Sequence, residues 1–392
     1  METLTTTDDE WTFLESKLPD TWRALAKEHG ILTREGGPSS AEANGWKLRD
    51  PAVLLRLLLH YVVTNSALKT TVALAAAVGL VDVSAVALHT WTRKAGGWIA
   101  AMVAAMVGTA TTFAGEQWAG YDVIAVDATT VQKPGAKGTT ARVHYALRLT
   151  DLRAMAIHVG DATVGETLRN FVMAAGQLWL ADRGYSNANS LAHAVAAHAD
   201  VLIRFALGPL PLFDAAGGAL DTRALIRSVA TAGSHREFTV WVRPHKADPI
   251  QARLIVCRLP QAKADEARKR LYREHTKSEV SALMLEMASY VVLITTVPRT
   301  RLTTLQLLEI YRLRWQLELS FKRDTSIAGL DMLPSHLPET IHCWICTKLL
   351  ATQLARRIAE PGEPFPPSVV GVYALPLRLH HLAAYAARSG RA

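Results

Sequence analysis

The sequence predicts an α/β fold with a mixed sheet, preceded by an all-helical N-terminal domain and interrupted by a strand-rich insertion. Three observations support this prediction. Apolar residues recur at helical spacing through residues 10–115. After Tyr121, short apolar runs alternate with helical segments, which is the order of an α/β unit. At 208–286, Gly-Pro and Gly-Gly breaks separate further strand-like runs.

The N-terminal domain carries clear helix signals. Pro51 directly after Asp50 is typical of a proline at the first helical position behind its cap, and apolar residues then repeat through 54–62. The 21 residues 95–115 are uncharged, which by length alone suggests a membrane span. They are mostly Ala, Gly and Thr, however, so we expect a buried helix near 98–107 and no membrane contact.

A pair of helices in this domain resembles a helix-turn-helix. We expect helices over 71–78 and 84–93 with a turn at Gly79 between them. Many helical hairpins look the same, and the segment has few basic residues: Lys69, Arg93 and Lys94. DNA binding and a purely structural hairpin therefore both stay open as interpretations.

The central and C-terminal regions are predicted to alternate strands and helices. The apolar runs 123–126 and 178–181 end on Asp127 and Asp182. Further elements expected are a strand hairpin at 143–149 and 154–159, helices at 165–175 and 187–198, strands at 201–205, 235–242, 253–258 and 290–295, a basic helix at 263–277, a long helix at 302–325, and one more helix in the tail.

The predicted domains follow from these changes in pattern. They are a helical N-terminal domain at 1–118, the first part of an α/β core at 119–206, the insertion with its basic helix at 207–288, the second part of the core at 289–358, and a C-terminal tail with a helix at 359–392.

The charge of the chain permits a polyanionic partner. Among 392 residues the formal net charge is +8. The excess lies late in the chain, since 252–323 holds 14 Lys/Arg against 7 Asp/Glu, whereas 1–120 holds 10 against 12. Three cysteines are too few for a disulfide framework, and the N-terminus has no basic or apolar leader. Both observations indicate the cytoplasm.

The strongest functional pattern lies in the predicted long helix. At about 100° per residue, Tyr311, Arg314, Glu318 and Lys322 share one face. One interpretation is a solvated ladder of i,i+4 ion pairs worth ~0.3–0.5 kcal/mol each. The strand-end aspartates favour another. Aspartate is a poor strand former, and α/β sheets hold ligands at their strand ends.

Three such acids suit divalent metal ions. Asp127, Asp182 and Glu318 offer hard oxygen ligands, which fit Mg²⁺ or Mn²⁺ rather than zinc. Two ions ~3.5–4 Å apart can activate an attacking water or 3′-hydroxyl and stabilise the leaving oxygen of a phosphodiester. The flanking arginine and lysine would then hold phosphates.

With these three acids and the Tyr311–Glu318 spacing, the chain resembles the DDE transposases of the insertion-sequence-four family, the bacterial cut-and-paste group with a Y-x2-R-x3-E-x6-K signature. The resemblance rests on the segments 126–130, 180–185 and 311–318, and on the long strand-rich insertion between the second and third acids. The acids are separated by 55 and then 136 residues, which is the short-then-long pattern of the family.

The resemblance implies an RNase H-like catalytic core with Asp127, Asp182 and Glu318 as catalytic residues and ligands of two Mg²⁺ (or Mn²⁺) ions. It implies a homodimer in a synaptic complex on terminal inverted repeats, hydrolysis at the 3′ ends, often a hairpin intermediate, and joining to target DNA. The residues that we expect to bind DNA are Tyr311, Arg314, Lys322, Arg183, Arg323 and Trp241.

One departure from the signature leaves alternatives open. The signature lysine falls at Thr325 here, and Lys322, one turn earlier on the same helical face, is a candidate for its phosphate contact. The copy could instead be weakened. The alternatives are therefore a nuclease with the same core but no strand transfer, and an end-binding protein that represses active copies.

Several other features have simpler explanations. Cys343 and Cys346 have CxxC spacing, but the sequence has no second pair of Cys or His ligands to complete a metal site. A packed helix is therefore expected rather than a metal site. Tyr311 as the nucleophile of a tyrosine recombinase would need an Arg/His constellation and no acidic triad. Trp241 is either a structural residue or a platform for a flipped base. The helix at 263–277 is either a solvated face or a phosphate contact.

Overall fold

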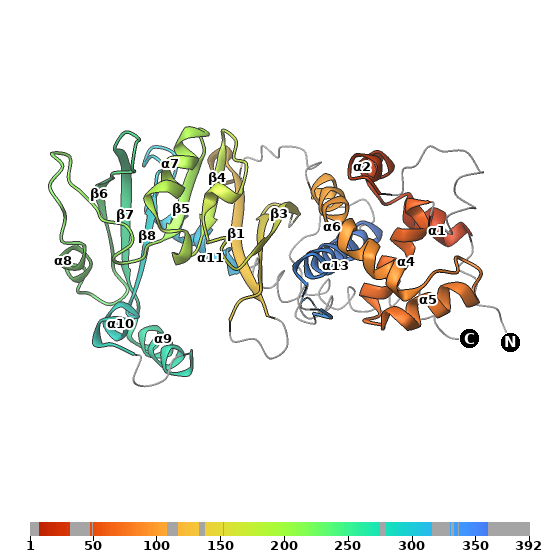
Figure 1. Ribbon diagram of the computed structural model, residues 1–392. Coiled ribbons are helices and arrows are strands. Elements are labelled where there is room, and N and C mark those ends of the chain that lie inside the picture. Colours follow the sequence, from red (N-terminus) through yellow and green to blue (C-terminus); the bar gives the residue numbers. More distant parts are fainter. Residues whose placement is uncertain are drawn as a thin grey trace.

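The structure is a computed structural model that describes residues 8–31, 48, 50–107, 117–132, 138–151, 153–274, 280–315, 330, 333–335 and 337–359. In Figure 1 a large sheet with its covering helices fills one half of the molecule, and a group of helices fills the other. The predicted α/β class with a mixed sheet is confirmed.

The sheet has eight strands in the order β3-β2-β1-β4-β5-β8-β7-β6. In chain order the strands are β1 Asp122–Val131, β2 Ala141–Arg148, β3 Ala154–Asp161, β4 Gln177–Ala181, β5 Asp200–Arg204, β6 His235–Val242, β7 Ile250–Arg258 and β8 Tyr290–Thr295. The pairs β1/β4 and β4/β5 are parallel and the other pairs are antiparallel. The two strands of the predicted insertion, β6 and β7, therefore extend the sheet through β8.

Helices cover both faces of this sheet. One face packs against helix α7 (Ala188–Ala196) and the segment 205–229, which includes the short helix α8 (Thr222–Arg227). The other face packs against helix α11 (Thr304–Arg312), whose Leu307 and Ile310 are buried there. The remaining helices of this half are α9 (Gln261–Glu274) and α10 (Ala282–Met287), which follow β7.

The helical half joins segments from both ends of the described chain. It contains α1 Asp8–Glu15, α2 Trp22–Glu28, α4 Pro51–Val63, α5 Leu68–Ala77 and α6 Ala85–Val107, together with α13 Pro338–Ala359. In Figure 1 the blue α13 lies beside the orange α6. Their shared core includes Trp98 and Trp344, and it continues onto the edge of the sheet at β2 and β3.

Gly96 marks the closest approach of α6 to α13. A Cβ atom at this position would lie 2.7 Å from Nδ1 of His342 and 3.4 Å from the backbone nitrogen of Cys343. Cys343 and Cys346 are both buried in the same core, so the packed helix expected around them is confirmed. The two helices pack through this small residue.

Most predicted elements occur within a few residues of their expected bounds. Asp50 caps α4 by accepting a hydrogen bond from the Ala52 amide, with Pro51 first in the helix as predicted. The buried helix expected near 98–107 is the second half of α6. In the described part of the chain, no helix combines the length and apolarity that a bilayer span requires.

The prediction of a helix at 165–175 is wrong. Only Leu168–Asn170 forms one short 3₁₀ turn, capped by the side chain of Thr167. The chain then runs extended, which buries Phe171 and Met173 and leaves Val172 exposed. This alternation packs two side chains on the sheet, and it has the period of extended backbone rather than of a helix.

The helix predicted at 302–325 is also not continuous. Helix α11 ends at Arg312, and the amides of Leu313 and Arg314 bond to the carbonyls of Ile310 and Tyr311, three residues back. Such a tightened turn has three residues per turn, which aligns side chains at i and i+3. It therefore brings Arg314 over the same side as Tyr311. Residues 316–329 and 360–392 lie outside the described residues.

Candidate active site at the strand ends

The register of the parallel strands places three charged residues in one row. Ala125 on β1 pairs with Leu180 on β4, so two residues further on Asp127 lies beside Asp182. Ala181 pairs with Ile203 on β5, so Asp182 in turn lies beside Arg204. Neighbouring strands are ~4.8 Å apart, so the row Asp127–Asp182–Arg204 spans about 10 Å.

This row faces the layer that contains α11. Side chains alternate along a strand, and the residues two positions before the row, namely Ala125, Leu180 and Leu202, all belong to the core beneath α11. Asp127, Asp182 and Arg204 lie on that same face, at the level where β4 and β5 end. The end of α11 therefore meets the ends of three strands.

Tyr311 and Arg314, both predicted from sequence, reach the row from α11. The guanidinium Nη1 of Arg314 lies 3.4 Å from Oδ2 of Asp127. The Tyr311 hydroxyl donates to the carbonyl of Ala181, directly before Asp182, over 3.4 Å. The structure thus brings together four of the predicted site residues, from segments up to 187 positions apart.

The environment of Asp127 opposes its charge. Burial raises the pKa of Asp127 to about 6, against the opposing influence of the Ala128 amide, which donates to Oδ1 over 2.8 Å, and of Arg314. The Asp182 and Glu166 carboxylates raise the pKa further. A cation at this point would relieve the crowding of negative charge.

Asp182 carries an unsatisfied oxygen. Its Oδ1 is buried and has no hydrogen-bond partner in the part of the chain that the structure describes. A buried carboxylate oxygen without a partner is costly unless a cation or donor completes it. Two carboxylates with hard oxygen donors, one of them orphaned, fit a divalent ion such as Mg²⁺.

The described residues do not complete a metal site. Within the described ranges, no three His, Cys, Asp or Glu side chains are grouped closely enough to hold an ion. The expected third ligand, Glu318, lies outside those ranges, and so do Lys322, Arg323 and Thr325.

Two other predicted DNA-binding residues lie at different distances from the row. Arg183 follows Asp182 directly and is exposed. Trp241 lies on β6, the outer strand, four strands from β4, which is roughly 19 Å at the spacing of a sheet. It forms reciprocal backbone hydrogen bonds with Phe213. The register also places Trp241 toward the opposite end of the sheet from Asp182.

Arg204 was missed in the sequence analysis. Its Nε is buried without a hydrogen-bond partner, and no described carboxylate forms an ion pair with it. Arg183 and Tyr311 lie near enough for the charge of Arg204 to lower the pKa of each. The signal was available, because Arg204 ends the run 201–203 as Asp182 ends its own run.

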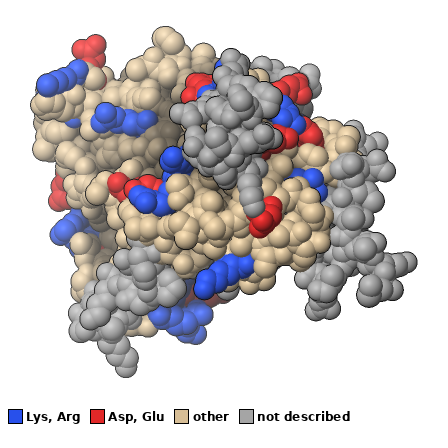
Figure 2. All heavy atoms as spheres, turned by 45° about the vertical axis from the view of Figure 1, so that its right-hand side comes forward, with Lys and Arg blue, Asp and Glu red and all other residues tan. Residues whose placement is uncertain are grey.

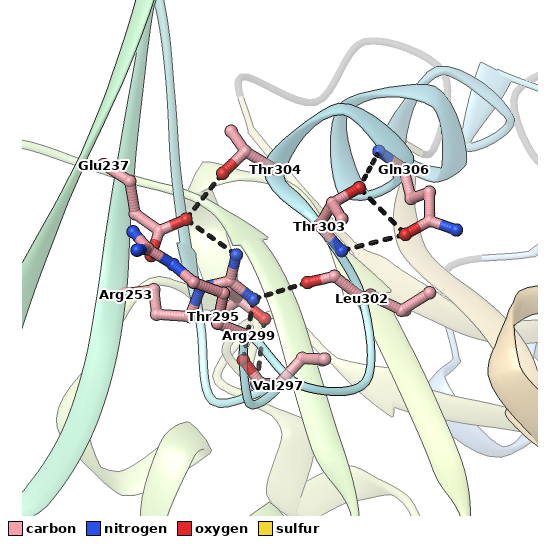
Figure 3. Close-up of polar contacts among 9 residues, drawn as sticks. All are labelled: Glu237, Arg253, Thr295, Val297, Arg299, Leu302, Thr303, Thr304 and Gln306. Carbon is pink, nitrogen blue, oxygen red and sulfur yellow. Dashed lines mark hydrogen bonds and ion pairs between the residues drawn. The ribbon is translucent and has the colours of Figure 1, made fainter.

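A buried ion pair fixes the start of α11 (Figure 3). Glu237 of β6 and Arg253 of β7 lie 2.7 Å apart, with side chains only 7% and 9% exposed. Arg253 also donates to the carbonyls of Val297 and Leu302, and Thr304, the first residue of α11, donates to Glu237 over 2.5 Å. We call Glu237, Arg253 and Thr304 the helix clamp.

The hydrogen-bond partners of Glu237 strongly stabilise the ionised form of its carboxyl group. Burial would raise the pKa of Glu237, but hydrogen bonds from Arg253, Thr304 and Arg299 outweigh it and hold the pKa at about 2. Thr303 and Gln306 add a reciprocal capping box at the same end of the helix. Helix α11 is therefore anchored at one end to the antiparallel pair β6–β7, which we call the outer hairpin, and reaches the row at the other.

Comparison with known proteins decides the family. Residues 118–354 match the family described as "Transposase DDE domain". The chain belongs to the DDE transposases.

Two relatives in Escherichia coli are similar over nearly their whole length. The chain is 30% identical to "Putative transposase InsL for insertion sequence element IS186A" over 372 residues, which is 93% of this chain and 97% of that protein. It is likewise 30% identical, over 373 residues, to "Transposase for insertion sequence element IS421". In this DDE transposase the family segment includes the whole sheet, α11 and most of α13.

Proposed function

We propose that this protein is the transposase of a bacterial insertion sequence, which binds terminal inverted repeats, cuts DNA at the ends of its element and joins the 3′ ends to target DNA in the cytoplasm. One observation carries the proposal. Asp127 and Asp182 adjoin at the ends of parallel strands, beneath an α11 end that supplies Tyr311 and Arg314. The first five strands, in the order 3-2-1-4-5, correspond in this proposal to an RNase H-like core.

Asp127, Asp182 and Glu318 would hold the divalent ions, Mg²⁺ or Mn²⁺. When bound, two such ions activate the attacking oxygen and stabilise the leaving oxygen of a phosphodiester. Without DNA, Arg314 partly neutralises Asp127. When DNA is bound, the Arg314 guanidinium would have a phosphate as a second anionic partner besides Asp127, and it can bind a phosphate through two parallel hydrogen bonds.

Tyr311 and Arg204 would hold the DNA beside the cut. Burial raises the pKa of Tyr311 to about 12, so its hydroxyl stays protonated at neutral pH and acts as a hydrogen-bond donor. Arg204 lies one strand from Asp182, and no carboxylate of the described ranges pairs with its guanidinium. A donor and cations that converge on one strand end suit the scissile phosphate and its neighbour.

The rest of the DNA path is proposed to involve α9 and the outer hairpin. Lys269 and Arg273 are exposed on α9, whose acids Asp265 and Glu266 already pair with Arg268 and Lys263. On the face shown in Figure 2, blue and red side chains are interspersed among the coloured residues rather than gathered in one basic patch. We propose that DNA is held by several small contacts and that a homodimer supplies both ends in one complex.

The decisive experiment is Mg²⁺-dependent cleavage of DNA that carries the inverted repeats flanking the gene. Wild type should cut at the repeat ends, whereas Asp182→Asn and Glu318→Ala should bind the same DNA and not cut it. Asp161→Asn is the matched control, because Asp161 is an exposed aspartate at the end of β3 whose side chain bonds locally, to Thr163 and the Val164 amide.

The outcomes separate the candidate functions. Cutting followed by joining of the ends to a target plasmid supports a transposase, and cutting without joining indicates a nuclease with the same core. If wild type binds the repeats but cuts no better than Glu318→Ala, the protein is an end-binding repressor, and the enzymatic proposal is wrong.

A further inference from the structure

A fourth carboxylate lies beside the row, on the loop between β3 and β4. A Cβ atom added to Gly184 would overlap the Glu166 carboxylate, so Glu166 occupies the space that this glycine leaves open. Gly184 is two residues after Asp182. The charge of Glu166 acts on Asp127 as well, which places it near both acids of the row.

A buried hydroxyl lies close to these acids in the chain. Tyr185, three residues after Asp182, is fully buried, and its hydroxyl has no hydrogen-bond partner among the described residues. Burial raises the pKa of Tyr185, and the carboxylates of Glu166, Asp127 and Asp182 raise it further, Glu166 most of the three. The Tyr185 hydroxyl and Oδ1 of Asp182 are thus two unsatisfied buried groups on one short segment next to Gly184.

No described cation neutralises Glu166 through an ion pair. The charge of Arg142 acts on Tyr185, but its Nη1 donates to the carbonyl of Val164 over 2.9 Å. Arg314 pairs with Asp127, but among the described residues Glu166 has no ion pair and Oδ1 of Asp182 has no hydrogen-bond donor. A hydrated divalent ion supplies both positive charge and hydrogen-bond donors.

We propose that Glu166 is a fourth acidic residue of the metal centre, which binds the divalent ion through its coordinated water molecules. This inference rests on the proposed function. Mg²⁺ keeps several waters when it is bound by few carboxylates, so an acid beyond direct ligand distance still accepts hydrogen bonds from that shell. The role also explains Gly184, because any side chain there would displace Glu166.

The test measures Mn²⁺ binding to the full-length protein without DNA, by electron paramagnetic resonance of the free ion. Glu166→Gln should weaken binding about 10-fold or more, the usual loss when an outer partner of a metal site is removed. Glu309→Gln, which removes one charge from an exposed glutamate on α11, should bind like wild type. Asp182→Asn should bind far more weakly than either.

Gly184→Ala provides a second route that leaves Glu166 in place. The overlapping atom is the end of a flexible side chain, so the protein should fold normally while the carboxylate moves away, and Mn²⁺ affinity should fall. With Fe²⁺ in place of Mn²⁺, and with hydrogen peroxide as oxidant and ascorbate as reductant, hydroxyl-radical cleavage of the backbone should occur near 166 as well as near 127 and 182.

Each result has one meaning. If Glu166→Gln and Gly184→Ala bind Mn²⁺ as tightly as Glu309→Gln while Asp182→Asn does not, the role of Glu166 is refuted and the proposed function stands. If wild type binds no Mn²⁺ and cuts no DNA, the metal centre itself is refuted, and the role of Glu166 with it.

Discussion

Arg204 shows how much of this site depends on strand register. It ends β5 beside Asp182, with a buried Nε that has no partner among the described residues. An arginine left without a described carboxylate partner at that place is costly in free energy unless an anion binds it. Its position follows from the pairing of β4 with β5.

We predict that Arg204→Met lowers cleavage and leaves stability nearly unchanged. Methionine keeps the apolar stem of the side chain but cannot bind phosphate. Loss of one charge-assisted hydrogen bond of ~1.5–3 kcal/mol should slow cutting roughly 10- to 100-fold. The free energy of unfolding should change by less than about 1 kcal/mol.

Cleavage rates at saturating DNA and urea unfolding measure the two effects. Arg236→Met, at an exposed arginine on the outer strand β6, is the control and should cut normally. A cleavage rate for Arg204→Met equal to that of the control would show that Arg204 does not bind the phosphate.

Single residues also show what the sequence could and could not predict. Asp127 and Asp182 were predictable because each closes an apolar run, which is a local pattern. Tyr311 and Arg314 were predictable from their spacing. Glu166 was not, because its place beside Gly184 depends on a loop in which the expected helix does not form.

At the scale of elements, the helix clamp ties α11 to the outer hairpin. A carboxylate of β6 binds a guanidinium of β7 and the first hydroxyl of α11, all largely shielded from water. Removing one partner of such a pair leaves the other charge buried and alone. The cost is typically about 3–5 kcal/mol.

We therefore expect Glu237→Gln to lower the free energy of unfolding by about 3 kcal/mol or more. Glu286→Gln removes a glutamate of the exposed pair with Arg227 and should cost no more than about 1 kcal/mol. Urea unfolding of both variants checks this. Equal losses would mean that the clamp contributes no more than a surface pair.

The clamp also predicts how stability depends on pH. Because the folded pKa of Glu237 is about 2, below its ordinary value of 4.5, its ionised form stabilises the fold. That contribution is complete above about pH 5 and is lost as pH falls toward 2. The difference in unfolding free energy between wild type and Glu237→Gln should shrink over this interval.

Unfolding titrations at several pH values between 2 and 7 measure that difference directly. A difference that stays constant down to pH 2 would show that Glu237 is not held ionised by Arg253, Thr304 and Arg299.

Local sequence patterns predicted which segments form helices and strands better than they predicted which elements pack or pair with each other. The strands β6 and β7 were expected in a separate insertion, and nothing local indicates that they pair with β8 and lengthen the sheet. The break after Arg312 was likewise hidden, because the helical spacing of Tyr311 and Arg314 fits a continuous helix equally well. Long-range pairing decides both features.

For the whole molecule, the contact of α6 with α13 holds the helical half together. Gly96 permits this contact, since any Cβ there would meet His342 and the backbone of Cys343. Gly96 and His342 are 246 residues apart in the sequence. Local sequence patterns therefore did not indicate the contact.

We predict that Gly96→Val destabilises the protein by about 1–3 kcal/mol through overpacking. Ala104→Val, at an exposed position of the same helix, is the control. By helix propensity alone, Gly96→Val should be mildly favourable and Ala104→Val mildly unfavourable. Thermal unfolding that follows this order, with Gly96→Val the more stable, would contradict close packing at Gly96.

The return of α13 to the first helices has a consequence for the newly made chain. Trp98 and its neighbours on α6 acquire their final cover only after residues 338–359 have left the ribosome. Translation at ~5–20 residues per second makes that delay roughly ten to fifty seconds. During this interval the apolar surface of α6 lacks its α13 partner, so we expect chaperones to bind the nascent transposase until α13 has been made.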